Sequence, residues 1–246
     1  SILASYPLKG EYKTIVKVKS LSSDISELKE SLESKDHVEK AAYNFIYEGS
    51  PFDSEDVVYK DGNNPVELAA VHHKLIKTAE AWKHSKGEGV LVGIADSGIE
   101  LSHPDMKDNL WTNSAEFGFD ENGVNKCENG IDEDNNGKID DCFGWDFSSN
   151  DNSPDVVKDG GGKDHGTHVG GIVAATENGF GAVGVAPEAK ILALRFYGSA
   201  SWTSEVILKT YLYAINAGTK IINTSYNVDK FYGDEVYSTA IDAVYD

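Results

Sequence analysis

From residue 68 onward, apolar segments with the length of strands alternate with segments of helical periodicity. Strands are predicted at 89–96, 190–197 and 220–226, and helices at 69–85, from residue 165, at about 203–217 and at about 233–245. Apolar strands separated by helices favour a parallel sheet that is covered on both faces. We therefore expect an α/β fold with a doubly wound parallel sheet, whose reactive side chains gather at the carboxyl ends of the strands.

The N-terminal part has a different pattern, in which a predicted strand, helix and strand follow one another at 11–18, 22–34 and 38–47. A polar, turn-rich stretch then separates it from the alternating pattern. The expected organisation is a small α+β segment at 1–49, a linker at 50–67, and an α/β domain at 68–246 with a polar insertion at about 107–163.

The chain is strongly acidic, with a formal net charge of −19 at pH 7. This charge argues against nucleic acid or an anionic membrane as a partner. No apolar run has the length needed to span a membrane, and the first residues show no signal-peptide pattern. An exported, salt-tolerant or cation-binding protein fits these properties.

The two cysteines, Cys127 and Cys142, lie in the same acidic segment of the insertion. They are either a pair of reduced surface thiols or a disulfide that closes the acidic loop. We favour the disulfide, since closing a loop stabilises the folded chain. A disulfide in turn favours a secreted or periplasmic location.

Two short motifs carry residues suited to catalysis. Asp96, in "ADSG", ends a predicted apolar strand, and His165, in "HGTHVGG", opens a predicted helix. A lone aspartate after a strand is usually a turn or capping residue. An aspartate beside a histidine, however, can accept the Nδ1–H of the ring and stabilise the imidazolium that forms when the histidine acts as a base.

The motifs "ADSG…HPD", "HGTHVGGIVAA…GVAP" and "KIINTSY" occur in this order and resemble those of the subtilisin-like serine peptidases. The resemblance covers about residues 68–246. It implies that Asp96 is the triad aspartate and His165 the general base, in the family's order Asp, His, Ser. It also implies a packed, structural role for His168, and protein or peptide substrates as partners.

Residues 11–47 resemble the second half of the family's propeptide, which acts as a folding chaperone and temporary inhibitor. Self-cleavage is then expected between Glu48 and Asn64, and a generic N-terminal extension is the alternative. In the family, a Gly-Thr-Ser stretch carries the nucleophile and an asparagine donates to the oxyanion, but neither motif occurs here. We therefore expect a C-terminally incomplete sheet, a chain that is inactive alone, and the missing C-terminal part of the domain as a possible partner.

The resemblance also implies a calcium site, with the side chains of Asp105 and Asn178 and the carbonyls of Thr176, Phe180 and Ala182 as ligands. Calcium accepts six to eight oxygen ligands at flexible angles. The alternative is a hydrogen-bonded polar loop without an ion.

A second calcium site is predicted in "NGIDEDNNGKIDD", which follows the first half of an EF-hand loop. The candidate ligands are Asp132, Asp134, Asn136, the carbonyl of Lys138, and Asp140 or Asp141. Phe143 stands where an EF-hand has its bidentate glutamate, so Asp140 or Asp141 would have to close the site. A solvated acidic loop is the alternative.

The resemblance further implies that a peptide substrate is bound as an added strand between two segments. Ser225, Tyr226 and Asn227 lie on one side, and residues from Ser199 to Trp202 on the other. Asn227 stands where the family usually has glycine, so its side chain could narrow the primary pocket. The expected function is a calcium-stabilised serine endopeptidase. The alternatives are a non-catalytic relative that binds peptides or partners, and a secreted, calcium-stabilised binding module.

Overall fold

The computed structural model describes residues 2–7, 14–18, 25–38, 40–42, 46–47, 71–156, 164–179, 181–197 and 202–225. The predicted linker at 50–67 and the predicted helix at about 233–245 lie outside the described residues. None of the helices in the described ranges combines the length and the apolarity needed to cross a membrane.

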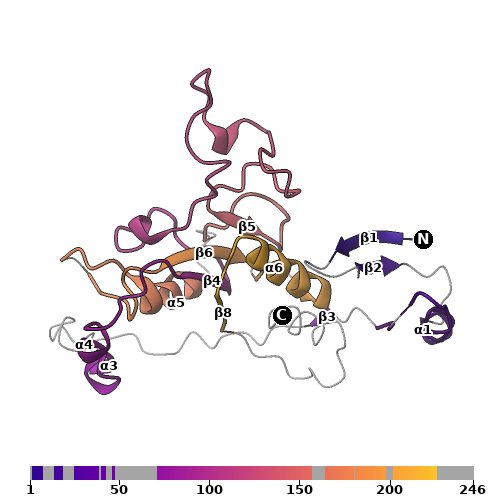
Figure 1. Cartoon of the computed structure of the whole chain (residues 1–246), viewed down its shortest axis with the longest axis horizontal. Helices are drawn as coiled ribbons and strands as arrows, with labels where there is room; N and C mark the ends of the chain where they lie inside the picture. Colours follow the sequence, from indigo (N-terminus) through magenta and orange to yellow (C-terminus); the bar gives the residue numbers. More distant parts are fainter. Residues whose placement is uncertain are drawn as a thin grey trace.

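A parallel sheet forms the centre of the described structure (Figure 1). Its strands lie in the order β5 (Gly144–Asp146), β6 (Lys190–Arg195), β4 (Leu91–Asp96) and β8 (Ile221–Thr224). All three pairings are parallel. The predicted α/β class and the three predicted strands of the sheet are thus confirmed.

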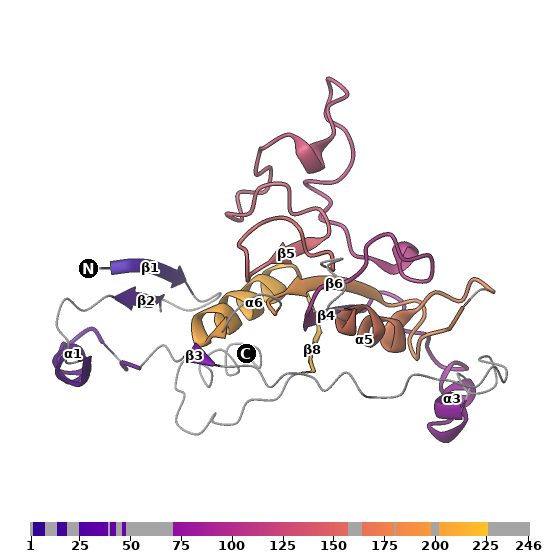
Figure 2. The ribbon, with the colours of Figure 1, turned by 180° about the vertical axis from the view of Figure 1, so that it is seen from behind.

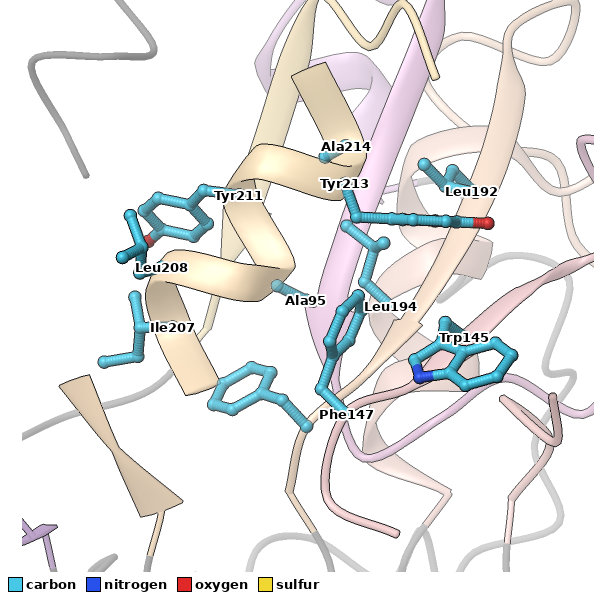
Figure 3. Close-up of a cluster of buried hydrophobic side chains, with 11 residues drawn as sticks. Ala95, Trp145, Phe147, Leu192, Leu194, Ile207, Leu208, Tyr211, Tyr213 and Ala214 are labelled. Carbon is cyan, nitrogen blue, oxygen red and sulfur yellow. The ribbon is translucent and has the colours of Figure 1, made fainter. Parts of the chain in front are cut away.

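Alternate residues of β4 and β6 enter two apolar cores on opposite faces of the sheet. On one face, Leu192 and Leu194 pack with Trp145, Phe147 and helix α6 (Ser204–Asn216), as Figure 3 shows. On the other face, Ile191 and Ala193 pack with Ile94, Met106 and the end of helix α5 (His165–Ala174). Burial on both faces explains why these strands are continuously apolar rather than alternating.

Helix α6 begins where the sequence predicts. Its N-cap residue is Thr203, whose Oγ1 accepts a hydrogen bond from Val206 N at 3.4 Å. The predicted helix at 69–85 is instead broken into α3 (Val71–Leu75) and α4 (Thr78–Ala81). The break is at Lys77, whose φ of 57° is incompatible with a continuous right-handed helix.

The predicted insertion contains a strand of the sheet that its polar composition hides. Strand β5 pairs with β6, and Trp145 and Phe147 enter the core beside it. The rest of the insertion includes the short 3₁₀ helices η1 (Lys107–Asn109) and η2 (Lys126–Glu128). The segment around η2 projects away from the sheet in both views (Figures 1 and 2). A disulfide joins Cys127 and Cys142, with 5.6 Å between their Cα atoms.

The N-terminal residues form an antiparallel pair, β1 (Ile2–Pro7) and β2 (Thr14–Val18), followed by helix α1 (Ile25–Glu33). Of the strand predicted at 38–47, only β3 (Ile46–Tyr47) is a strand among the described residues. It pairs antiparallel with β7 (Trp202–Thr203), the short strand that leads into α6. This pairing brings the N-terminal segment to the segment between β6 and α6.

Candidate active site and cation-binding loops

Asp96 is the last residue of β4, and its side chain is only 5% exposed. Helix α5 packs against β4 and begins at His165, so that the histidine faces the end of the strand. His165 Nδ1 lies 2.8 Å from Asp96 Oδ1 and 2.9 Å from Oδ2. The structure therefore brings together the two residues that the sequence motifs single out, although they are 69 positions apart.

The turn after Asp96 fixes the orientation of its carboxylate. Ser97 N donates to Asp96 Oδ1 at 2.7 Å, and Gly166 N donates to Ser97 Oγ at 3.1 Å. Gly98 has a φ of +104°, a backbone conformation that suits glycine. A Cβ atom at Gly166 would lie 2.3 Å from Gly98 O, so glycine allows the helix to approach the turn this closely.

The imidazole of His165 is placed to act as a base. Its Nδ1 is engaged by a buried carboxylate, while 31% of the side chain is exposed. A carboxylate on Nδ1 fixes the tautomer and stabilises the imidazolium, which leaves Nε2 as the nitrogen that can exchange a proton with a nucleophile. His168, for which the motif predicts a packed position, is exposed instead.

The serines near this pair do not resemble a nucleophile. Ser97 is 4% exposed, and its Oγ accepts the hydrogen bond from Gly166 N. Ser225 lies just after β8, where its Oγ accepts a hydrogen bond from Asn223 Nδ2 at 2.8 Å. Each hydroxyl oxygen thus accepts a hydrogen bond from a structural partner, and neither is described in contact with the imidazole of His165.

The described ligand candidates of the first predicted calcium site lie together. Asp105, 5% exposed, accepts hydrogen bonds from Ala182 N at 2.9 Å and from Asn178 Nδ2 at 3.3 Å. Thr176 N donates to Asp105 O at 2.7 Å, and Thr176 Oγ1 is buried with no hydrogen-bond partner among the described residues. Phe180 lies outside the described residues.

The second loop brings together two of the expected carboxylates, Asp132 and Asp134, with a third that was not expected. Glu116, Asp132 and Asp134 offer oxygens that all lie within 4.8 Å of one another. Asp140 instead accepts hydrogen bonds from Gly130 N, at 3.1 and 3.3 Å. Asp141 is fully buried and accepts from neutral donors on Tyr213, Asn113 and Asn136.

Glu116 is the residue of this loop that sequence reasoning missed. It lies 16 positions before Asp132 in the sequence, outside the motif that resembles an EF-hand loop. No local sequence pattern connects the two residues. Its side chain is fully buried, Oε1 accepts from Glu133 N at 2.8 Å, and Oε2 has no partner among the described residues. A buried carboxylate oxygen without a donor, beside two more carboxylates, is a suitable ligand for a hard cation.

The same burial changes the protonation of Glu116. Loss of solvation, and after it the nearby charges of Asp141 and Glu133, raise the pKa of Glu116 from 4.5 to about 7. Burial likewise raises the pKa of Asp141. Lys138, a predicted carbonyl ligand, places its Nζ 4.3 Å from the centre of the Trp145 ring, and burial lowers the pKa of its ammonium group.

Only part of the predicted substrate-binding set can be placed. Trp202 belongs to β7 and pairs with Tyr47, so this segment can accept an added antiparallel strand. Ser225 lies at the other predicted segment. Ser199, Tyr226 and Asn227 lie outside the described residues.

The comparison with known proteins agrees with this geometry. The model of the subtilase family matches residues 87–245, and the chain belongs to that family. Thermitase from Thermoactinomyces vulgaris is 32% identical over 154 residues, which are 61% of this chain and 42% of thermitase. The minor extracellular protease Vpr from Bacillus subtilis is 30% identical over 241 residues, 94% of this chain and 25% of Vpr.

Among solved structures, fervidolysin from Fervidobacterium pennivorans, a keratinolytic enzyme related to subtilisin, matches 82% of this chain and 27% of its own. Its TM-score is 0.46 and its identity 17%. The chain spans less than half the length of these two curated relatives, 42% of thermitase and 25% of Vpr. Membership of the subtilase family rests on the match of the family model to residues 87–245.

We predict that, with a chelator present to remove metal ions, the free energy of unfolding of the chain falls as the pH rises from 4.5 to about 7. The folded chain binds the Glu116 proton more tightly than the unfolded chain does, so raising the pH in this window favours unfolding. Urea unfolding at several pH values with a chelator present measures the effect. In Glu116→Gln, which does not titrate, this part of the pH dependence is expected to disappear. Identical profiles for the two chains would contradict the prediction.

Proposed function

We propose that the protein to which this chain belongs is a serine endopeptidase that hydrolyses peptide bonds in protein or peptide substrates. The observation that carries this proposal is the contact of both Asp96 carboxylate oxygens with His165 Nδ1 at the carboxyl end of a parallel strand. Membership of the subtilase family supports it. In this mechanism His165 takes the proton of a serine, and Asp96 stabilises the resulting imidazolium.

The serine that attacks the peptide bond is not assigned within these residues. The 246 residues contain no Gly-Thr-Ser stretch, and Ser97 and Ser225 have structural partners. We propose that a part of the protein outside this sequence supplies the nucleophile and the oxyanion donor. The 246-residue chain would then supply the base, its aspartate and one wall of the substrate cleft.

We further propose that both loops bind calcium. At the first site, Asp105 is buried, and Thr176 Oγ1 lacks a partner among the described residues. At the second, Glu116, Asp132 and Asp134 would be the carboxylate ligands. Bound calcium would neutralise carboxylates that repel one another in a chain of net charge −19.

Residues 1–49 are proposed to act as a propeptide that covers the substrate cleft. The pairing of β3 with β7 supports this role, because β7 carries Trp202 of the predicted substrate segment. An ion pair between Lys17 and Glu205 joins β2 to the first turn of α6, and Glu205 also contacts Lys209 at 3.0 Å. The linker at 50–67 is the proposed processing region, and 68–246 the peptidase part.

The disulfide between Cys127 and Cys142 supports a location outside the cytosol, where such bonds persist. The name of Vpr, an extracellular protease, agrees with that location. We therefore propose a secreted or periplasmic protein.

The whole protein is expected to hydrolyse peptides and to react with a fluorophosphonate. Asp96→Asn should lower kcat by about 10⁴, because the histidine loses its correct tautomer. His165→Ala should abolish labelling, whereas His84→Ala, at an exposed histidine, should leave kcat unchanged. The 246-residue chain alone should show no labelling. A whole protein that binds peptides without hydrolysing them would point instead to a non-catalytic relative.

Calcium is expected to raise the melting temperature of the chain, because an ion bound only by the folded state stabilises it by mass action. Glu116→Gln should weaken the affinity of the second site by about tenfold or more, since a carboxylate ligand is lost. Calorimetric titration measures this, with the exposed Glu128→Gln as a control for charge alone. Equal calcium affinity in Glu116→Gln and the unaltered chain would exclude Glu116 as a ligand.

Reversing one charge at the contact of the N-terminal segment should loosen that contact. Glu205→Lys removes the partner of Lys17 and repels both Lys17 and Lys209. Amide exchange at Ile46 and Tyr47 should become about threefold faster or more, the scale of a partly exposed ion pair. The control is Glu33→Lys, which breaks the Lys29–Glu33 pair within α1. Equal exchange in both variants would contradict a role for Glu205.

A further inference from the structure

Arg195 is the single arginine among the 22 lysines and arginines of the sequence. It ends β6, and its side chain is 8% exposed. Its Nη1 donates to Asp146 Oδ2 at 2.7 Å, and the Asp146 side chain is fully buried. A planar guanidinium is better suited than an ammonium to such a buried pair, because it is more weakly hydrated and its donors are rigidly oriented.

Arg195 lies between two aspartates on neighbouring strands. It is in register with Asp96 of β4 on one side and with Asp146 of β5 on the other. The backbone also joins these positions, because Phe196 N donates to Asp96 O at 3.1 Å and Phe147 N donates to Arg195 O at 2.6 Å. The three charged residues therefore form a row along the carboxyl edge of the sheet, and all three are buried.

Asp146 in turn organises the loop that follows β5. Its Oδ1 accepts hydrogen bonds from Ser148 N, Ser148 Oγ and Ser149 N, at 2.7 to 3.1 Å. Its backbone exchanges two hydrogen bonds with Asp151, at 2.9 and 3.1 Å. The pair with Arg195 thus fixes a compact turn, which leads directly to Pro154.

This loop supports the turn that carries Asp96. Pro154 O accepts from Ile99 N at 3.0 Å, and Asp155 Oδ1 accepts from Leu101 N at 3.4 Å. Gly98 is enclosed between the loop and Arg195: a Cβ there would lie 2.8 Å from Pro154 O and 3.0 Å from Arg195 Cδ. The arginine stem and the loop that its guanidinium anchors therefore contact the same turn.

We propose that Arg195 is a positioning residue for the Asp96–His165 pair. Paired with Asp146, it fixes the Ser97–Gly98–Ile99 turn from two sides, so that both oxygens of Asp96 stay on His165 Nδ1. In this role Arg195 acts through the turn and the loop, and not by contact with the imidazole. This role rests on the proposed peptidase function, in which the tautomer of His165 decides whether it can act as a base.

The test measures the tautomer of His165 in the 246-residue chain by ¹⁵N NMR of labelled histidine, which requires no activity. The unaltered chain should show the neutral ring with its proton on Nδ1, since the bond to Asp96 selects that tautomer. In Arg195→Met, which retains the stem and removes the charge, this single tautomer should be lost. Arg195→Lys should retain more of it than Arg195→Met does.

Because Arg195→Met leaves Asp146 buried without its partner, the double variant Arg195→Met/Asp146→Asn removes both charges and protects the fold. It should also lose the single tautomer. Lys29→Met, which breaks an exposed ion pair on α1, is the matched control and should leave His165 unchanged.

An unchanged Nδ1–H tautomer in the folded double variant would overturn the positioning role while the proposed function stands. Equal loss in Arg195→Lys and Arg195→Met would overturn it as well. Mixed tautomers in the unaltered chain would contradict both the positioning role and the proposed function, because there would be no fixed Asp96–His165 pair.

Discussion

The close packing of helix α5 against the end of β4 places His165 on Asp96, and the rest of the site depends on it. Glycine at 166 allows this close approach, because a Cβ atom at that position would lie only 2.3 Å from Gly98 O. One turn later Gly170 faces Met106, where a Cβ would lie 3.1 Å from the methionine Cε. An alanine at Gly166 would push the imidazole away from the carboxylate, and a hydrogen bond of 2.8 Å would not survive such a shift.

The structure buries several carboxylates, and each of them is stabilised by different partners. Asp96 has the imidazole and a backbone N–H as partners, and Asp146 has the guanidinium of Arg195. Asp141 has neutral donors, among them the Tyr213 hydroxyl at 2.7 Å. Glu116 accepts from Glu133 N through one oxygen, and its other oxygen has no partner among the described residues. A buried charge needs compensation, so the least compensated carboxylate is where a cation would contribute most.

These groups are also connected through the core between the sheet and α6. Tyr213 of α6 reaches from the apolar core to Asp141 of the acidic loop, and Phe147 contacts the Tyr213 ring edge-on. Strand β7, which precedes α6, pairs with β3 of the N-terminal segment. A single helix thus contacts the acidic loop with one of its faces and continues from the strand that borders the proposed substrate cleft.

The sequence by itself determined the parallel α/β architecture and the Asp96–His165 pair. Continuous apolar strands require burial on both faces, and the two motifs end a strand and open a helix. The sequence could not show β5, because Gly144–Asp146 is short and lies within a polar segment. It also could not show that the predicted helix breaks at Lys77. Only the tertiary structure decided that Glu116, rather than Asp140 or Asp141, joins Asp132 and Asp134, and that Arg195 lies between Asp96 and Asp146. Those contacts depend on strand register and on the path of a disulfide-closed loop, and both arise from packing between residues distant in the chain.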